Sequence, residues 1–105
     1  GGGGNRSQIQ LGSILLQQDS RRVFVDGKGI ELKNKEYELL LFLMLNADIV
    51  FSKETLYERI WGYDAMGDNA TVAVHINRLR DKIEKTPSEP RYIQTVWGAG
   101  YRFKP

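Results

Sequence analysis

Residues 70–84 read ATVAVHINRLRDKIE, and their side chains separate into two stripes when they are placed on a helix. One stripe is apolar and is expected to pack on the core of the protein. Its members are Val72, Ile76, Leu79 and Ile83. The other stripe is polar and basic. Its members are Thr71, His75, Arg78 and Lys82, with Val74 beside them. The segment is therefore predicted to be an amphipathic helix with one basic face.

The residue types of the basic face are those with which proteins read double-stranded DNA. Arginine can donate two hydrogen bonds to guanine O6 and N7, threonine and valine can touch thymine methyl groups, and lysine or histidine can reach phosphate. An isolated basic helix is nevertheless more often an ordinary solvated surface. The neighbouring elements decide between the two interpretations.

Short strands are predicted on the N-terminal side of this helix. Between polar turns lie apolar or alternating segments at residues 9–11, 14–16, 23–25 and 30–32. Asp26 and Gly27 together are a strong signal for a tight hairpin turn. We expect these segments to form a four-stranded antiparallel sheet.

Two further helices are predicted between the sheet and the basic helix. Asn34 can cap the first, and its apolar side chains recur at helical spacing. They are Tyr37, Leu40, Leu41, Met44 and Leu45, widened by Leu39, Phe42 and Leu43. Ser52 can cap the second helix, which is expected to run from Lys53 to Trp61. Asp68 or Asn69 can cap the basic helix itself.

The C-terminal part is predicted to be a β-hairpin. A strand-like segment at residues 92–96 is followed by a glycine-rich turn at residues 97–100 and a closing strand at residues 101–103. Glycines let the tip of such a hairpin approach another backbone closely. Sheet, three helices and hairpin in this order outline a winged helix-turn-helix, so the fold class is α+β with residues 95–102 as the wing. This order favours the DNA-reading interpretation of the basic helix.

The length of 105 residues fits one domain, which we place at residues 8–105. Residues 1–7 begin with four glycines and are interpreted as a cloning remnant and the end of a linker. The lack of cysteine and the single histidine exclude disulfides, thiolate zinc sites and multi-histidine metal sites. No metal and no cofactor are therefore expected.

Charge is unevenly distributed along the chain. Residues 1–69 carry eight Lys and Arg against ten Asp and Glu, a balance of −2. Residues 70–105 carry seven against three, a balance of +4. A polyanionic partner would explain this asymmetry, although charge alone is equally compatible with random surface variation.

The most distinctive segments are TVAVHINRLRDKI at residues 71–83 and YIQTVWGAGYRF at residues 92–103. Shorter distinctive segments are EYELL at residues 36–40 and LYERIWG at residues 56–62. Together they closely resemble the C-terminal effector domain of OmpR/PhoB-type response regulators. The resemblance extends from about residue 9 to residue 103, and its set of motifs is highly specific.

The resemblance implies a bacterial, cytoplasmic transcription factor of a two-component regulatory system. Such domains follow a phosphorylated receiver domain and bind direct DNA repeats as head-to-tail dimers. We therefore expect promoter DNA and a receiver domain as partners, no membrane association, a mainly monomeric isolated domain and a tandem dimer on DNA. In this family the loop between the second and third helices often touches RNA polymerase. Here that loop comprises Tyr63, Asp64, Ala65, Met66, Gly67 and Asp68.

The resemblance also assigns DNA contacts by position. Base contacts fall on Thr71, Val74 and Arg78. Contacts to the DNA backbone fall on Trp61, His75, Arg80, Thr95 and Tyr101, to which we add Lys82, Trp97 and Arg102. Arg80 lies off the basic stripe, so an ion pair within the protein is an equal alternative for it.

Several positions depart from the family pattern. Trp97 stands where the family often has an arginine that enters the minor groove, and an indole cannot supply that charge. It could instead pack on a sugar or donate one hydrogen bond, so base readout should depend more on the helix than on the wing. Ala70 and Asn77 replace common basic residues, which predicts a shallower dependence of affinity on salt. Asp81 is expected to point away from DNA or to pair with a cation.

Two other functions stay open from the sequence. A protein-interaction module could use the basic face on an acidic partner, and a failure to bind duplex DNA even at low salt would favour it. An enzyme is the other, but the chain lacks a phosphate-binding glycine motif followed by lysine and has no nucleophile–base set around its single histidine. We therefore do not expect an enzyme.

Overall fold

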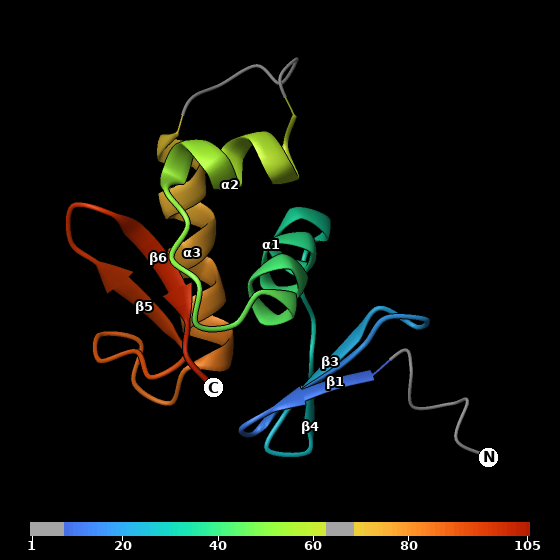
Figure 1. Cartoon of the computed structure of the whole chain (residues 1–105). Helices are drawn as coiled ribbons and strands as arrows, with labels where there is room; N and C mark the ends of the chain where they lie inside the picture. The colour runs from blue at the N-terminus through green and yellow to red at the C-terminus, as the bar shows by residue number, and fades with distance from the viewer. Residues whose placement is uncertain (1–7, 63–68) are drawn as a thin grey trace.

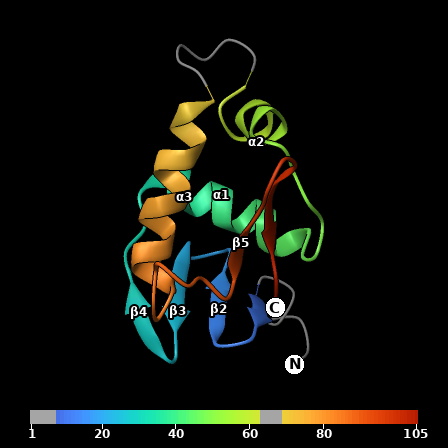
Figure 2. The same ribbon diagram turned by 90° about the vertical axis from the view of Figure 1, so that its left-hand side faces the viewer.

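The computed structural model describes residues 8–62 and 69–105. Its first elements are four short antiparallel strands. The strands lie below α1 in Figure 1, and they follow one another across the sheet in chain order, as Figure 2 shows. They are β1 Gln8–Leu11, β2 Ile14–Gln17, β3 Arg22–Val25 and β4 Lys28–Ile30. Because side chains alternate along a strand, one face directs Ile14, Leu16 and Val23 into the core. The predicted four-stranded sheet is confirmed.

The Asp-Gly signal for a hairpin turn is confirmed between β3 and β4. Val25 pairs with Lys28, which leaves Asp26 and Gly27 as the two turn residues. Both have positive φ, 54° and 79°, as the favoured two-residue hairpin turn requires. The tight turn sets the pairing directly after Gly27, so β4 lies at residues 28–30 and not at the predicted 30–32.

Three helices follow the sheet: α1 Asn34–Leu45, α2 Lys53–Ile60 and α3 Ala70–Ile83. α1 contacts β1 on one side and the other two helices on the other (Figure 1). Its buried apolar residues are Tyr37, Leu39, Leu40, Leu43 and Met44. Leu45, the last apolar residue of the predicted stripe, does not join the core. Its side chain is 57% exposed, because the buried stripe is centred on Leu39 and Leu43 and leaves Leu45 at its edge.

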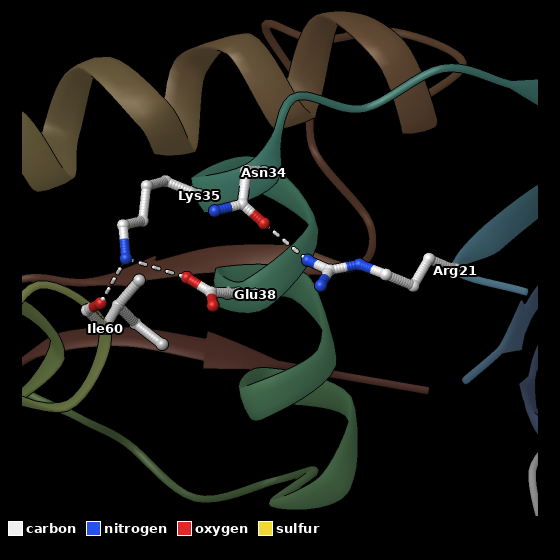
Figure 3. Close-up of polar contacts among 5 residues, drawn as sticks. All are labelled: Arg21, Asn34, Lys35, Glu38 and Ile60. Carbon is white, nitrogen blue, oxygen red and sulfur yellow. Dashed lines mark hydrogen bonds and ion pairs between the residues drawn. The ribbon is translucent and has the colours of Figure 1, made fainter. Parts of the chain in front are cut away.

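Side-chain caps fix the starts of the first two helices. The predicted cap of α2 is confirmed, since Ser52 Oγ accepts a hydrogen bond from a backbone N–H in the first turn. Asn34 is not the cap of α1. Lys33 occupies that position, and the carboxylate of Glu36 accepts from its backbone N–H at 3.0 Å. Asn34 already lies in the first turn, where its side chain accepts a hydrogen bond from Arg21 (Figure 3).

α3 begins after Asn69, whose side chain makes no capping hydrogen bond, and it ends one residue before the predicted end. All four residues predicted to face the core are buried, and none is more than 2% exposed. They are Val72, Ile76, Leu79 and Ile83. α2 crosses α3 near its N-terminal end, which gives the helix-turn-helix pair (Figures 1 and 2).

A β-hairpin closes the fold beside α3 (Figure 2). Its strands are β5 Ile93–Val96 and β6 Gly100–Phe103. Phe51, in the link between α1 and α2, exchanges two backbone hydrogen bonds with Tyr101, both 2.9 Å long. The base of the hairpin is therefore bound to the helical part of the protein.

The observed order of elements confirms the predicted α+β winged helix-turn-helix, with a four-stranded sheet, three helices and a terminal hairpin. Among the residues that the structure describes, no helix combines the length and the hydropathy needed to cross a membrane.

Candidate nucleic-acid interface

One face of α3 points away from the rest of the protein. Helical spacing places Ala70, Val74, Asn77, Arg78 and Asp81 on it, and all five are exposed. We call these five residues the outer face of α3. It includes two of the predicted base contacts, Val74 and Arg78, and Val74 is an apolar side chain with 46% of its surface exposed. Asn77 belongs to the outer face as well, and the sequence did not single it out as a contact.

The other residues of the basic stripe lie at the edge of the outer face. Thr71 and His75 are partly buried, and His75 Nδ1 donates to the backbone carbonyl of Thr71 at 2.9 Å. The His75 ring lies edge-on to Trp61, with ring centroids 4.9 Å apart, and Trp61 stacks on Tyr57 at 5.6 Å. Two predicted backbone contacts, Trp61 and His75, are thus brought together in an aromatic row of Tyr57, Trp61 and His75. Since Nδ1 carries the proton of the bond to Thr71, Nε2 donates only when both ring nitrogens are protonated.

Arg80 joins α3 to the hairpin on the opposite edge. Its Nε and Nη2 donate to the Ile93 carbonyl at 3.0 and 2.9 Å, and Nη2 also donates to Thr95 Oγ1 at 2.7 Å. The guanidinium carbon lies 5.8 Å from the centroid of the Tyr101 ring. Three predicted backbone contacts, Arg80, Thr95 and Tyr101, therefore form one cluster, which we call the Arg80 cluster.

The guanidinium of Arg80 is positively charged and bonded within the Arg80 cluster. Burial lowers the pKa of Arg80 from its ordinary value, while Tyr101 and Glu84 oppose that shift, and a guanidinium remains protonated at neutral pH. Its bonds to Ile93 and Thr95 occupy Nε and Nη2, so Nη1 is the nitrogen that they leave for a further acceptor. Arg80 is therefore held within the protein, but its hydrogen-bond partners are a carbonyl and a hydroxyl and not the carboxylate of the expected ion pair.

Lys82 points toward α1. Its Nζ lies 2.7 Å from Oε1 of Glu36, whose side chain is 1% exposed. Burial by itself would raise the pKa of Glu36. The hydrogen bonds from Lys82 and from the backbone N–H of Lys33, with the charge of Lys82, outweigh burial and hold the pKa below its ordinary value of 4.5. The predicted DNA contact of Lys82 stays a prediction, but its ammonium already has an internal partner.

This ion pair predicts a pH-dependent contribution to stability. Because the pKa of Glu36 is lower in the folded state, its contribution is complete above the ordinary value of 4.5 and is lost as the pH falls through the folded pKa. Glu36→Gln should lower the free energy of unfolding by about 1–3 kcal/mol at neutral pH. Denaturation at neutral and acidic pH measures the difference between the two proteins, which should shrink in acid. Glu58→Gln, at an exposed position of α2, is the control. A Glu36→Gln effect of equal size at both pH values would contradict this role.

Lys35 fixes the end of α2. Its Nζ donates to the carbonyl of Ile60 and to Oε2 of Glu38, each at 3.0 Å (Figure 3). Ile60 is the last residue of α2, and a cation at a helix C-terminus satisfies a carbonyl that has no partner within the helix. No sequence motif indicated this contact, because the two residues are 25 positions apart. The bond from Lys35 therefore fixes the backbone directly before Trp61.

Trp97 lies at the tip of the hairpin, and 91% of its surface is exposed. The Ala99 N–H donates to the Val96 carbonyl at 2.9 Å, and Gly98 has a φ of 81°. These features describe a type II turn with Trp97 and Gly98 as its central residues.

Arg102 lies further from the tip, opposite Gln94, and its Nη2 donates to the amide oxygen of Gln94 at 3.0 Å. Its Nε is buried and has no hydrogen-bond partner within residues 8–62 and 69–105. The predicted polymerase-contact loop, residues 63–68, lies outside the described residues.

The outer face of α3 is thus presented between two supports. The aromatic row lies on the α2 side, and the Arg80 cluster lies on the hairpin side. Within the described ranges no three side chains are grouped as a metal site would require. The arrangement offers a convex helix whose outer face carries one arginine, one amide, one carboxylate and two apolar side chains, bordered by further hydrogen-bond donors.

Known transcriptional regulatory proteins are similar to most of this chain. A family model described as "Transcriptional regulatory protein, C terminal" matches residues 27–103. The transcriptional regulatory protein SrrA of Staphylococcus aureus strain NCTC 8325 / PS 47 is 40% identical over 100 residues, which is 94% of this chain and 42% of SrrA. The chain therefore spans less than half the length of that relative.

Two solved structures are also similar. The response regulator DrrB, a Thermotoga maritima OmpR/PhoB homologue, has a TM-score of 0.88 and 38% identity, over 94% of this chain and 45% of DrrB. The DNA-binding domain of Klebsiella pneumoniae RstA, solved in complex with the RstA box, has a TM-score of 0.85 and 28% identity, over 94% of this chain and 98% of that one.

Proposed function

This chain belongs to the family of C-terminal DNA-binding effector domains of OmpR/PhoB-type transcriptional regulators, and on that premise we propose that it binds promoter DNA with α3 in the major groove. The family is one of regulators and not of enzymes. The observation that carries the proposal is the outer face of α3, exposed along the helix and bordered on both sides by hydrogen-bond donors.

Base recognition is assigned to the outer face and its edge. A B-form major groove of about 12 Å admits an α-helix. Arg78 can donate to guanine O6 and N7, and Val74, with Thr71 beside it, can meet thymine methyl groups. Asn77 can bond N6 and N7 of adenine in the same way, so we add it to the base contacts.

The two supports of the outer face fit the two phosphate backbones that border the groove. On the α2 side, the indole N–H of Trp61 is a suitable donor, and His75 can donate from Nε2 when both of its ring nitrogens carry a proton. On the hairpin side, the hydroxyls of Thr95 and Tyr101 and Nη1 of Arg80 serve the same purpose. Phosphate contacts of this kind set the register of the helix on DNA and leave sequence selection to the outer face.

Asp81 fits this placement because of its position along the helix. It lies seven residues beyond Val74, about 10 Å along the helix axis, in the C-terminal half of α3. Asp81 is also the outer-face residue nearest the C-terminal end of α3, three residues beyond Arg78. A straight helix leaves the curved groove toward this end, so the carboxylate of Asp81 can remain in solvent.

The remaining expectations concern the assembly. We propose that two copies bind direct repeats in tandem and that the isolated domain is mainly monomeric in solution. In the full-length protein a receiver domain would accompany it, residues 63–68 would contact RNA polymerase, and the protein would act in the cytoplasm. Sedimentation of the domain alone and with a two-repeat duplex tests the first two points. A dimer that persists on dilution without DNA would contradict them.

Replacement of Arg78 tests the reading role of α3 directly. Arg78→Ala should cost about 1–3 kcal/mol of binding free energy, and the loss should concern one base position. Arg22→Ala removes the same charge from β3, away from α3, and should have little effect on sequence preference. Titration of both variants with selected and scrambled duplexes measures the effect. If Arg78→Ala binds both duplexes as the wild type does, this role of Arg78 is wrong.

A further inference from the structure

The single histidine of the sequence uses one ring nitrogen inside α3. Nδ1 of His75 lies 2.9 Å from the backbone carbonyl oxygen of Thr71. A carbonyl oxygen can only accept a hydrogen bond, so Nδ1 carries a proton in every state that keeps this contact. In the neutral ring Nε2 therefore has a lone pair and no proton. The contact with Thr71 thus fixes the tautomer of His75.

The other ring nitrogen is accessible from outside. The edge-on contact with Trp61, at 4.9 Å between ring centroids, holds the His75 ring beside the outer face of α3. Within residues 8–62 and 69–105 Nε2 makes no hydrogen bond, and the buried side-chain atoms without a partner are the Tyr57 hydroxyl and Arg102 Nε. Nε2 therefore reaches solvent on the side of α3 where we assign the indole N–H of Trp61 to a DNA phosphate.

The ionisable groups around His75 keep their charge near neutral pH. The charge of His75 helps to lower the pKa of Glu36, so these two side chains lie close enough to interact. The groups of α1, α2 and α3 that lie around the ring or next to its contacts are Lys35, Glu36, Glu38, Tyr57, Arg78 and Lys82.

Histidine differs from all of these residue types. Carboxylates, phenols, ammonium groups and guanidinium groups ordinarily keep their charge between about pH 6 and 8, whereas histidine ordinarily changes its charge there. Glu36 is moreover paired with Lys82 at 2.7 Å, and Glu38 with Lys35 at 3.0 Å. The sequence has one histidine and no cysteine. A change in DNA affinity over this pH range can therefore be traced to one side chain.

We propose that His75 makes DNA binding by this domain dependent on pH, because Nε2 bonds a backbone phosphate only after the ring has taken up a second proton. This inference rests on the proposed function. The neutral ring presents a lone pair, which repels a phosphate oxygen. The imidazolium presents an N–H and a positive charge to the same oxygen. Binding to DNA is then accompanied by the uptake of up to about one proton, and the domain binds more tightly as the pH falls.

The affinity for a duplex selected by the wild-type domain tests the assignment. The wild type should bind about three- to tenfold more tightly at about pH 6 than at about pH 8. The slope of log K against log salt should be steeper at the lower pH by up to about one unit, because a further phosphate is neutralised. His75→Gln places a neutral amide at this position, so its affinity and its slope should be the same at both pH values.

A double variant is the matched control. His75→Gln combined with Arg22→His keeps one histidine in the chain but moves it to an exposed position of β3, away from α3. This protein should bind DNA with little dependence on pH. A pH dependence as large as that of the wild type, in either variant, would overturn the assignment to His75.

Nitrogen chemical shifts of the His75 ring follow the proton without a change of sequence. In the free domain at about pH 8 only Nδ1 should be protonated, and in the complex at about pH 6 both nitrogens should be. Equal wild-type affinity at the two pH values, or an unprotonated Nε2 in that complex, would show that His75 has no such role while the function of α3 stands. If the wild type binds no duplex at either pH, even at low salt, the proposed function itself fails.

Discussion

Gly100→Ala is expected to destabilise the protein by about 3 kcal/mol or more, the largest effect of a single methyl group in this fold. A Cβ at this position would lie 1.9 Å from the carbonyl oxygen of Phe51 and 2.8 Å from Cα of Ser52. These neighbours are backbone atoms, so the Phe51–Tyr101 bridge would have to open to make room. The φ of 142° at Gly100 adds strain for any residue with a side chain.

The hairpin supplies a matched control for Gly100. Gly98 also has a positive φ, 81°, but a Cβ there would have no atom within 4 Å. Gly98→Ala should therefore cost only the backbone strain, about 1 kcal/mol. Chemical denaturation of the two variants separates the steric effect from the conformational one. Equal losses of stability would mean that the close approach to Phe51 is not a constraint.

Glu84→Ala is expected to have the second-largest effect, a loss of about 3 kcal/mol. Glu84 follows the end of α3 and is 7% exposed. Its carboxylate accepts hydrogen bonds from the backbone N–H groups of Arg91, Tyr92 and Ile93, at 2.8, 3.0 and 2.8 Å. These bonds connect α3 to the first strand of the hairpin, and truncation would leave three backbone donors without this acceptor, of which that of Ile93 is buried.

Two further variants show whether the charge of Glu84 matters. Glu84→Gln keeps the size of the side chain, but its amide would direct N–H groups toward backbone donors, so most of the loss should remain. Glu89→Gln makes the same change at an exposed position of the same connection and should be neutral. Denaturation gives the free energies, and amide exchange at Ile93 reports local opening. Stability of Glu84→Gln equal to that of Glu89→Gln would contradict the anchoring role.

The parts of the fold that local patterns determine could be predicted from the sequence. The apolar stripe of α3 and the Asp26-Gly27 turn depend on residues close in the chain, and both are confirmed. The expectations for Leu45 and Asn34 were wrong for two other reasons. Leu45 lies at the edge of the apolar stripe, and the rest of the fold does not cover it. The cap of α1 is Lys33, whose backbone N–H bonds Glu36, while the Asn34 side chain bonds Arg21.

The same distinction applies to the candidate site. Helical periodicity suffices to put Val74 and Arg78 on an exposed face. It does not reveal that Lys82 pairs with Glu36 across 46 positions, or that Arg80 bonds Thr95 across 15. Such long-range partners turn Lys82, a member of the basic stripe, toward the protein, whereas Asn77 is exposed on the outer face.

Selection of duplexes from a random pool tests the central claim, that the outer face of α3 reads DNA. The wild-type domain should enrich direct repeats about 10–11 bp apart, the spacing that places two copies on one side of the helix. Arg78→Ala should enrich the same pattern with one base preference lost in each repeat. No enrichment by the wild type, or an identical preference at every position for Arg78→Ala, would contradict the claim.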